Sequence, residues 1–277
     1  MAPFLKWPGG KRWLVASHSE WLIRSEGQHI EPFLGGGAVF FHLRPNISIL
    51  TDSNEELIDT YSAIRDDPQG VFEQLRRHHS RHCSSYYYLM RSRKPRTTVS
   101  RAARFLYLNR TCFNGLYRVN LKGVFNVPIG SKTSVLLSTD DFSATSRLLS
   151  GAELMVSDFE KAISRAGDGD FVYADPPYTV KHNNNNFVKY NEKIFSWSDQ
   201  IRLAKAVRSA ASRGAYIMIS NADHLSVREL YADSIWSCSS VSRYSRLASS
   251  SEYRRGTTEL IVTNYLSDDG DILSPRG

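Results

Sequence analysis

The sequence predicts a doubly wound α/β fold, interrupted by a mainly helical insertion that carries a β-hairpin loop. Short runs, each long enough for one strand, occur at residues 28–33, 47–50, 154–156, 171–174 and 215–220, and all but the first are apolar. Helical patterns separate most of these runs, which is typical of a parallel sheet. A long basic stretch without this alternation follows the second run. We therefore expect an α/β domain formed by residues 1–56 and 143–277, with residues 57–142 inserted into it.

The N-terminal part of the chain is expected to form a strand, a glycine turn, a helix and a second strand. The strand at residues 28–33 leads into three consecutive glycines, and the apolar run 38–43 follows as a helix. The strand at residues 47–50 ends at Asp52. Inside the insertion, helical periods occur at residues 55–64, 71–77 and 101–109, before a loop-rich stretch at 114–130.

The α/β alternation resumes after residue 151 and ends in a β-rich segment. Ser196 and Asp199 have the spacing of a helix-capping pattern, which predicts a helix over residues 196–212. Two β-prone segments, 235–242 and 258–265, predict an antiparallel hairpin at the C-terminal end.

The composition is that of an ordinary globular protein of 277 residues, with 41% hydrophobic and 23% charged residues. The apolar runs are too short to span a bilayer, and the N-terminus lacks the pattern of a secretory signal, so no membrane association is expected. Cys83, Cys112 and Cys238 are widely spaced and suit neither a disulfide framework nor a zinc site, and no metal site is predicted. A reducing, cytoplasmic setting follows.

The positive charge is concentrated in the insertion. Between Gly70 and Val135 there are 13 lysines and arginines and one acid, Glu73, a balance of +12 in a chain of net charge +7. Aromatic residues such as Tyr86 and Tyr117 are interleaved with these arginines. This mixture favours a nucleic-acid partner, because it supplies both phosphate contacts and stacking surfaces. The alternative is a solvated basic surface.

The glycine turn and the carboxylate that follows it indicate a nucleoside ligand. Phe33, Gly35 and Gly37 form a turn whose backbone can approach a ligand closely, and Asp52 lies 17 residues after Gly35 at the end of the next strand. A carboxylate there can accept hydrogen bonds from both ribose hydroxyls of a cofactor. The spacing suits a nicotinamide cofactor as well as S-adenosylmethionine. The alternatives are an ordinary tight turn for the glycines and a helix N-cap for Asp52.

Asp175-Pro176-Pro177-Tyr178 follows the strand at residues 171–174, at the sheet edge where ligands of open α/β folds bind. The prolines stiffen the backbone, so the Asp175 carboxylate and the Pro176 carbonyl could accept both N–H groups of an amino group on a heteroaromatic ring. They would stabilise the positive charge that develops when this poorly nucleophilic nitrogen reacts. Tyr178 could stack on the base. The alternative is a strand-end turn with a core tyrosine.

Together these motifs resemble the Dam-type DNA adenine N6-methyltransferases, in the order that this family shows and over nearly the whole chain. The matching segments are FLKWPGGK at residues 4–11, EPFLGGG at 31–37, NRTCFNGLYR at 109–118, FNVP at 125–128, DPPY at 175–178, Ser220-Asn221 and the strand at 257–265. The resemblance implies a Rossmann-like methyltransferase fold and S-adenosylmethionine as cofactor.

The resemblance also assigns cofactor-binding residues. These are Trp7, Lys11, Phe33, Gly35, Asp52, Asp158, Phe159 and Asp175. Trp7 and Lys11 would line the pocket, Asp52 would bind the ribose, and Asp158-Phe159 would hold the cofactor adenine. From the residues alone, Asp158-Phe159 also suits a helix cap followed by a core aromatic residue.

DNA contacts would come from the insertion and the N-terminal motif. The resemblance implicates Lys6, Arg110, Phe113, Asn114 and Arg118. Arg118 would contact a guanine edge and Lys6 the first guanine of the site, while Phe113 would fill the gap left by an extruded adenine and Asn114 would face the orphaned base. Alternatively, Phe113 is a hairpin core residue and Arg118 a phosphate contact. Val119 and Tyr117 depart from the family pattern, which affects fine sequence preference.

The resemblance also implies that one loop lies near the flipped base, and it implies which reaction the protein catalyses. Phe187 and Tyr190, in the loop at residues 181–190, match the family pattern there. The expected activity is methyl transfer to adenine N6 in duplex DNA, at GATC, with base flipping, by an enzyme associated with the nucleoid. The alternatives are a methyltransferase acting on RNA or on cytosine N4, and a non-catalytic nucleic-acid-binding protein. A cognate restriction endonuclease and the oligomeric state are left open.

Overall fold

The computed structural model describes residues 1–120, 123–181, 195–243, 257–266 and 274–275. The chain divides into two compact units. The first unit contains Met1–Val15, Leu34–Asn46 and Asp52–Val156, and the second contains Ala16–Phe33, Ile47–Thr51 and Ser157–Gly277. The expected insertion, residues 57–142, lies in the first unit together with other segments, so it is not set apart as a unit of its own. Its boundaries therefore stay a prediction.

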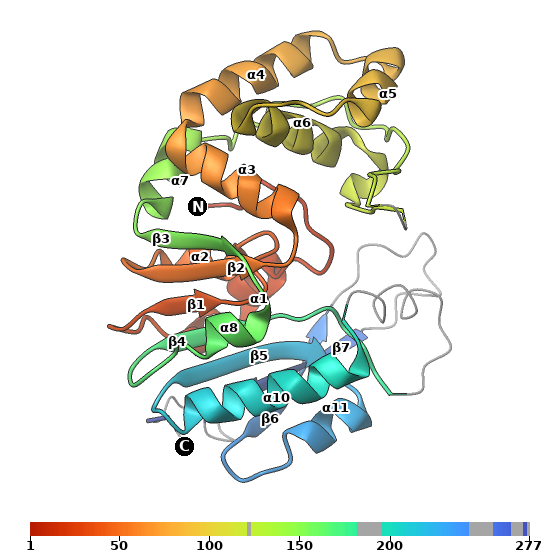
Figure 1. The fold of residues 1–277 in the computed structure, drawn as a ribbon. Coiled ribbons are helices and arrows are strands. Elements are labelled where there is room, and N and C mark those ends of the chain that lie inside the picture. The colour runs from red at the N-terminus through yellow and green to blue at the C-terminus, as the bar shows by residue number, and fades with distance from the viewer. Residues whose placement is uncertain (121–122, 182–194, 244–256, 267–273, 276–277) are drawn as a thin grey trace. The chain divides into compact units, whose positions relative to one another are not determined.

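The seven described strands form a sheet in the order β3-β2-β1-β4-β5-β7-β6 (Figure 1). They are β1 (His29–Glu31), β2 (Ser48–Asp52), β3 (Ala152–Val156), β4 (Phe171–Ala174), β5 (Tyr216–Ala222), β6 (Ser237–Arg243) and β7 (Thr257–Thr263). Strands β2, β1, β4 and β5 are parallel neighbours, whereas β7 is antiparallel to both β5 and β6. The α/β class and the antiparallel C-terminal pair are thus confirmed.

The strand order reverses between β1 and β4. From β1 the chain adds β2 on one side, and from β4 it adds β5 on the other. In open α/β sheets, ligands bind outside the carboxyl ends of the strands at this kind of reversal. Phe33 follows β1 and Asp175 follows β4, so two of the predicted site residues lie next to it.

The helices of the first unit are α2 (Ala38–Leu43), α3 (Glu55–Asp66), α4 (Pro68–Ser80), α5 (Ser84–Ser92), α6 (Thr98–Thr111), the 3₁₀ turn η2 (Phe113–Gly115) and α7 (Phe142–Leu149). The short helix α1 (Arg12–Ser17) passes from the first unit into the second. Helices α4, α5 and α6 lie close together, and α6 also packs on α3 (Figure 1). Asn54, Asp67 and Thr97 cap α3, α4 and α6 through their side-chain oxygens.

The second unit contains η1 (Ser19–Trp21), α8 (Phe159–Ile163), α10 (Trp197–Ala211) and α11 (Leu225–Leu230). The predicted capping pattern of α10 is confirmed, because Ser196 and Asp199 exchange both capping hydrogen bonds. Helix α10 packs on β5 and on α8 (Figure 1).

Four short helices were not predicted: α1, α5, α7 and α11. Each has between six and nine residues, too few turns for a helical period to stand out. Helix α5 is rich in tyrosine, which favours strands when judged by propensity alone. Packing decides its conformation, because Tyr87 and Met90, three residues apart, are both buried.

Candidate functional site

The glycine turn after β1 is tied to the end of β2. Gly35 and Gly37 have φ angles of +48° and +64°, a region that glycine adopts readily. The Gly35 N–H donates to Asp52 Oδ2 at 3.1 Å, and the Asn54 N–H donates to Asp52 Oδ1 at 2.9 Å. Burial raises the pKa of the Asp52 carboxyl, although these backbone donors act in the opposite direction. Helix α3 is capped by Asn54, so the N-cap alternative for Asp52 is wrong.

The N-terminal segment packs against this turn. A Cβ atom on Gly35 would lie 2.7 Å from Cδ1 of Trp7, so glycine is what allows the Trp7 ring to approach the backbone. The Trp7 ring also stacks with Tyr117, at a centroid distance of 5.4 Å. Lys11 is buried, and its Nζ donates to a backbone carbonyl two residues upstream at 2.8 Å. The structure thus brings Trp7, Gly35 and Asp52 together in the first unit.

The Asp-Pro-Pro-Tyr sequence forms an irregular segment directly after β4. Pro176 is buried, whereas Asp175, Pro177 and Tyr178 are half-buried. The Ser220 hydroxyl of β5 donates to Asp175 Oδ1 at 3.0 Å. Three of the four residues therefore keep some exposure, while the aspartate carboxylate is held by a neighbouring strand.

A carboxylate of β7 orients Tyr178. The Tyr178 hydroxyl donates to Glu259 Oε2 at 2.6 Å, and Glu259 is buried. Burial, followed by the charges of Asp175 and Glu259, raises the pKa of Tyr178 well above its usual value. The phenol therefore stays protonated and acts as a donor. Its stacking on a base remains a prediction.

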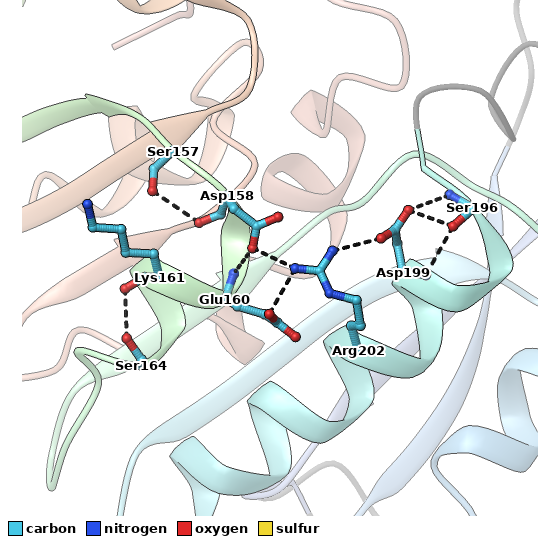
Figure 2. Close-up of polar contacts among 8 residues, drawn as sticks. All are labelled: Ser157, Asp158, Glu160, Lys161, Ser164, Ser196, Asp199 and Arg202. Atoms are coloured by element: carbon cyan, nitrogen blue, oxygen red, sulfur yellow. Dashed lines mark hydrogen bonds and ion pairs between the residues drawn. The ribbon is translucent and has the colours of Figure 1, made fainter.

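Asp158 lies at the start of α8 and is joined to α10 by Arg202 (Figure 2). Asp158 Oδ1 accepts from the Glu160 N–H at 2.9 Å and pairs with Arg202 at 3.0 Å. Arg202 also pairs with Glu160 and Asp199, each at 2.8 Å, and its guanidinium carbon lies 4.8 Å from the centroid of the Phe159 ring. The sequence reasoning missed Arg202, because its partners Asp158 and Glu160 lie more than forty residues away along the chain.

Three phenylalanines pack together beside Asp158. Phe159 stacks on Phe33 with a centroid distance of 5.3 Å and an interplanar angle of 27°, and Phe195 packs on both rings at 5.5 Å. Phe33 is half-buried, whereas the other two are buried. The structure therefore brings Phe33 and Phe159 together. It also shows the helix cap and core aromatic residue that Asp158-Phe159 was expected to form if it had only a structural role, so their cofactor role stays a prediction.

The predicted recognition hairpin begins later than expected, because residues 109–111 belong to α6. Val119 and Phe125 form an antiparallel bridge, and Arg118 Nε donates to Asn126 Oδ1 at 3.1 Å across the hairpin. Residues 121–122, which lie between the two bridged residues in the sequence, are outside the described residues. Arg118 is exposed, and its bond to Asn126 supports the guanidinium from one side.

Phe113 and Asn114 are exposed at the turn η2, and Lys6 packs against the same turn. Phe113 is 55% exposed, and Asn114 has a φ of +56°, an uncommon backbone for a residue with a side chain. A Cβ on Gly115 would lie 2.7 Å from Cδ of Lys6. Hydrogen bonds in both directions join the Lys6 backbone to the Asn109 side chain, at 3.0 and 2.7 Å. Burial, and then a neighbouring lysine, lower the pKa of Lys6.

Arg110 does not face the outside. It is 2% exposed, and its guanidinium binds both carboxylate oxygens of Asp140 at 2.6 and 2.7 Å. It also donates to the carbonyls of Phe4 and Val135 at 3.0 and 2.8 Å. A guanidinium enclosed in this way has no surface left for DNA, so we correct the DNA-binding role predicted for Arg110 to a structural one.

Two more arginines of the basic stretch are neutralised by acids outside it. Arg101 pairs with Asp59 at 2.8 Å, and the buried Arg104 pairs with Glu56 at 3.4 Å. Together with Arg110, they reduce the positive charge that this stretch can offer to a polyanion.

Some predictions fall outside what the structure describes. Phe187 and Tyr190, in the loop at residues 181–190, lie outside the described residues. Within the described ranges, no group of three or more histidine, cysteine, aspartate or glutamate side chains could hold a metal ion. None of the helices in these ranges has the length and apolar character needed to cross a membrane.

The chain is similar to known methyltransferases over most of its length. It is 40% identical over 275 residues to "Type II methyltransferase M1.LlaDCHI" of Lactococcus lactis subsp. cremoris, covering 96% of each chain. It is 33% identical to "Type II methyltransferase M.MjaIII" of Methanocaldococcus jannaschii, covering 95% of this chain and 99% of the relative. It is 32% identical to the DNA adenine methylase of Escherichia coli strain K12, covering 82% of this chain and 83% of the relative.

A family model described as "D12 class N6 adenine-specific DNA methyltransferase" matches residues 7–246. This range contains the glycine turn, the Asp-Pro-Pro-Tyr segment and the hairpin described above. The chain belongs to the D12 class of N6 adenine-specific DNA methyltransferases.

Proposed function

We propose that this enzyme transfers a methyl group from S-adenosylmethionine to N6 of adenine in duplex DNA, at GATC, with Asp175, Pro176 and Tyr178 acting on the target amino group. The observation that carries the proposal is the half-buried Asp-Pro-Pro-Tyr segment at the carboxyl end of β4, next to the reversal of strand order. Family membership sets aside the RNA, cytosine and non-catalytic alternatives.

Residues of the first unit suit the polar part of the cofactor. The Asp52 carboxylate, held by the Gly35 N–H, is an acceptor for ribose hydroxyls. Because Gly35 has no side chain, the Trp7 ring can lie against the backbone of the turn. Trp7, Lys11, Gly35 and Asp52 would thus hold the cofactor from this unit.

Phe33, Asp158 and Phe159 are the residues proposed to bind the adenine ring of the cofactor. The half-buried Phe33 stacks on Phe159 and offers an aromatic surface to an adenine ring, and Asp158 next to it offers a carboxylate acceptor. When bound, S-adenosylmethionine supplies a methyl group activated by its sulfonium.

The Asp175 carboxylate and the Pro176 carbonyl would act on the target nitrogen. The amino lone pair of adenine is delocalised into the ring. Accepting both N–H groups would hold the nitrogen toward tetrahedral geometry and stabilise the positive charge that develops on it. The proton would leave to water afterwards, so Asp175 serves as an acceptor throughout. Tyr178, oriented by Glu259, would stack on the base.

DNA recognition would fall to residues of the first unit. Phe113, which is exposed, would occupy the gap left by a flipped adenine, and Asn114 would face the orphaned base. Arg118 and Lys6 would read guanine edges. Two relatives are named type II methyltransferases, which supports a cognate restriction endonuclease as genetic partner. The enzyme would act in the cytoplasm on nucleoid DNA.

The test is methylation of an unmodified GATC duplex, with the modified atom identified by mass spectrometry. We expect N6-methyladenine with the natural chain, and a loss of at least about 100-fold in turnover with Asp175→Ala at nearly unchanged DNA affinity. Asp233→Ala, which removes an exposed acid of the same unit, is the matched control. Absence of N6-methyladenine with the natural chain would overturn the proposal, and near-normal turnover of Asp175→Ala would remove its mechanism.

A further inference from the structure

Two buried hydroxyl groups form a chain of hydrogen bonds that ends at Asp175. The Tyr173 hydroxyl, on β4, lies 2.9 Å from Oγ of Ser220 on β5, and Ser220 Oγ lies 3.0 Å from Asp175 Oδ1. Ser220 is completely buried and Tyr173 is 3% exposed, so neither hydroxyl can exchange these partners for bulk water. The two hydroxyls thus form a short buried row that ends on the carboxylate.

The direction of the hydrogen bonds follows from counting protons. An ionised carboxylate only accepts, so Ser220 must give its single hydroxyl proton to Asp175. The Tyr173 hydroxyl must then donate to Ser220 Oγ, which has no proton left for it. Burial, together with the Asp175 charge, raises the pKa of Tyr173 well above its usual value, which keeps the donated proton on the phenol.

The sheet register places these groups together. Tyr173 lies in β4, and Asp175 is the first residue after this strand. Ala174 pairs with Ile219 in the parallel ladder between β4 and β5, so Asp175 and Ser220 follow at the same level. Both hydroxyls are therefore carried by neighbouring strands of the sheet, β4 and β5, which hold them in place beside Asp175.

We propose that Tyr173 and Ser220 are positioning residues for Asp175, an inference that rests on the proposed function. The pair occupies Oδ1 of Asp175 and thereby sets the rotation of the carboxylate toward the amino group of the target base. Chained hydrogen bonds to a charged acceptor polarise one another, so the phenol strengthens the bond that the serine makes. The pair acts on how Asp175 meets the substrate and leaves cofactor binding to other residues.

The experiment compares Tyr173→Phe, Ser220→Ala and the double variant in single-turnover methylation of a GATC duplex. We expect the rate to fall about 10- to 100-fold for Ser220→Ala and about 3- to 30-fold for Tyr173→Phe, with little change in the apparent affinity for S-adenosylmethionine or DNA. The double variant should be no slower than Ser220→Ala, because the phenol acts only through the serine.

Tyr231→Phe is the matched control. Tyr231 is also a fully buried tyrosine of the second unit, but its hydroxyl has no hydrogen-bond partner among the described residues. Its loss should leave the rate unchanged. The pH profile gives a second readout: the acid limb of the rate should move to higher pH in Tyr173→Phe and Ser220→Ala, because donors to a carboxylate favour its charged form. Thermal melting of each variant shows whether it is folded.

The outcomes separate this inference from the proposed function. Absence of methylation by the natural chain would overturn the function itself. Normal methylation by the natural chain, with folded Tyr173→Phe and Ser220→Ala variants as fast as Tyr231→Phe, would overturn the inference alone. Additive rate losses in the double variant, or an unmoved acid limb, would also overturn it, because both would indicate two separate packing effects.

Discussion

At the residue scale, His78 is held in an environment that opposes its protonation. It is buried in α4, stacks on Tyr107 at a centroid distance of 5.0 Å, and its Nδ1 lies 2.9 Å from the Tyr86 hydroxyl. Burial, and to a lesser extent the charges of neighbouring arginines, lower the pKa of His78 from 6.5 to about 4. The imidazole therefore stays neutral above this pH, shares a hydrogen bond with the Tyr86 hydroxyl, and contributes packing rather than charge to the basic stretch.

This environment predicts how stability depends on pH. Between pH 6.5 and about 4, the unfolded chain protonates His78 while the folded protein does not, so the free energy of unfolding should fall as the pH drops through this window. His78→Gln should remove this contribution and reduce the change in the free energy of unfolding across this window by about 3 kcal/mol. Urea unfolding at several pH values measures it, with His79→Gln, an exposed neighbour, as control. Parallel curves for the natural chain and His78→Gln would contradict the prediction.

The buried Arg110 shows, at the same scale, a limit of sequence reasoning. Its motif and its place among other basic residues favoured a DNA contact. Its orientation is decided by Asp140, thirty residues further along the chain. A buried guanidinium is tolerated only when it is paired and hydrogen-bonded, and Asp140 with two backbone carbonyls meets that need.

At the scale of elements, α10 holds the start of α8 through Arg202. The side chain of Arg202 crosses from α10 to Asp158 and Glu160 (Figure 2). Its guanidinium also lies over the Phe159 ring. The segment proposed to bind the cofactor adenine is thus oriented by a helix that is not itself part of the proposed site.

We predict that Arg202→Ala weakens binding of S-adenosylmethionine about three- to tenfold. In this variant Asp158 and Glu160 lose their ion pairs, and Phe159 loses its cation–π contact. Isothermal titration calorimetry with the cofactor measures this. Arg208→Ala is the control, since Arg208 lies on the same helix and is equally exposed but pairs only with Asp233 and the Leu230 carbonyl among the described residues. Equal affinities of the two variants would contradict the role assigned to Arg202.

A substitution of Arg118 in the hairpin is expected to change how well the enzyme distinguishes one DNA sequence from another. Arg118→Lys removes the planar fork that a bidentate guanine contact needs and the Nε–H that Asn126 accepts. We expect discrimination between GATC and singly substituted duplexes to fall by about 1–3 kcal/mol, with little loss of non-specific affinity. Arg93→Lys, an exposed arginine outside the hairpin, should leave discrimination unchanged. Uniformly slower methylation of all duplexes would show that Arg118 contacts only the backbone.

Across the whole molecule, fewer basic side chains can contact DNA phosphates than the count of lysines and arginines in the sequence suggests. Arg101, Arg104 and Arg110 are paired with acids, whereas Arg93 and Lys94 are exposed at the end of α5. Counterion release on DNA binding depends on the charges that reach phosphates and not on the total.

The salt dependence of DNA binding tests this division. Replacing Arg93 and Lys94 by glutamine should reduce the slope of log K against log salt by about 0.9 for each phosphate that the variant no longer neutralises. Arg101→Gln should leave the slope nearly unchanged, because Arg101 is paired with Asp59. Fluorescence anisotropy with a duplex lacking the recognition site, at several salt concentrations, gives both slopes. Equal reductions would mean that pairing does not decide which charges reach DNA.

Local sequence patterns were enough to predict the strands of the sheet and the polar residues that directly follow them. Buried strands are short apolar runs, and the residues at their carboxyl ends lie at one sheet edge whatever the details of packing, so the glycine turn, Asp52 and Asp175 could be identified in advance. Tertiary structure alone decided which polar groups meet. Ser220 and Asp175 are 45 residues apart, and Arg202 and Asp158 are 44 apart. Such pairs depend on distances in space, on which local sequence patterns carry no information, so the positioning residues became visible only in the folded chain.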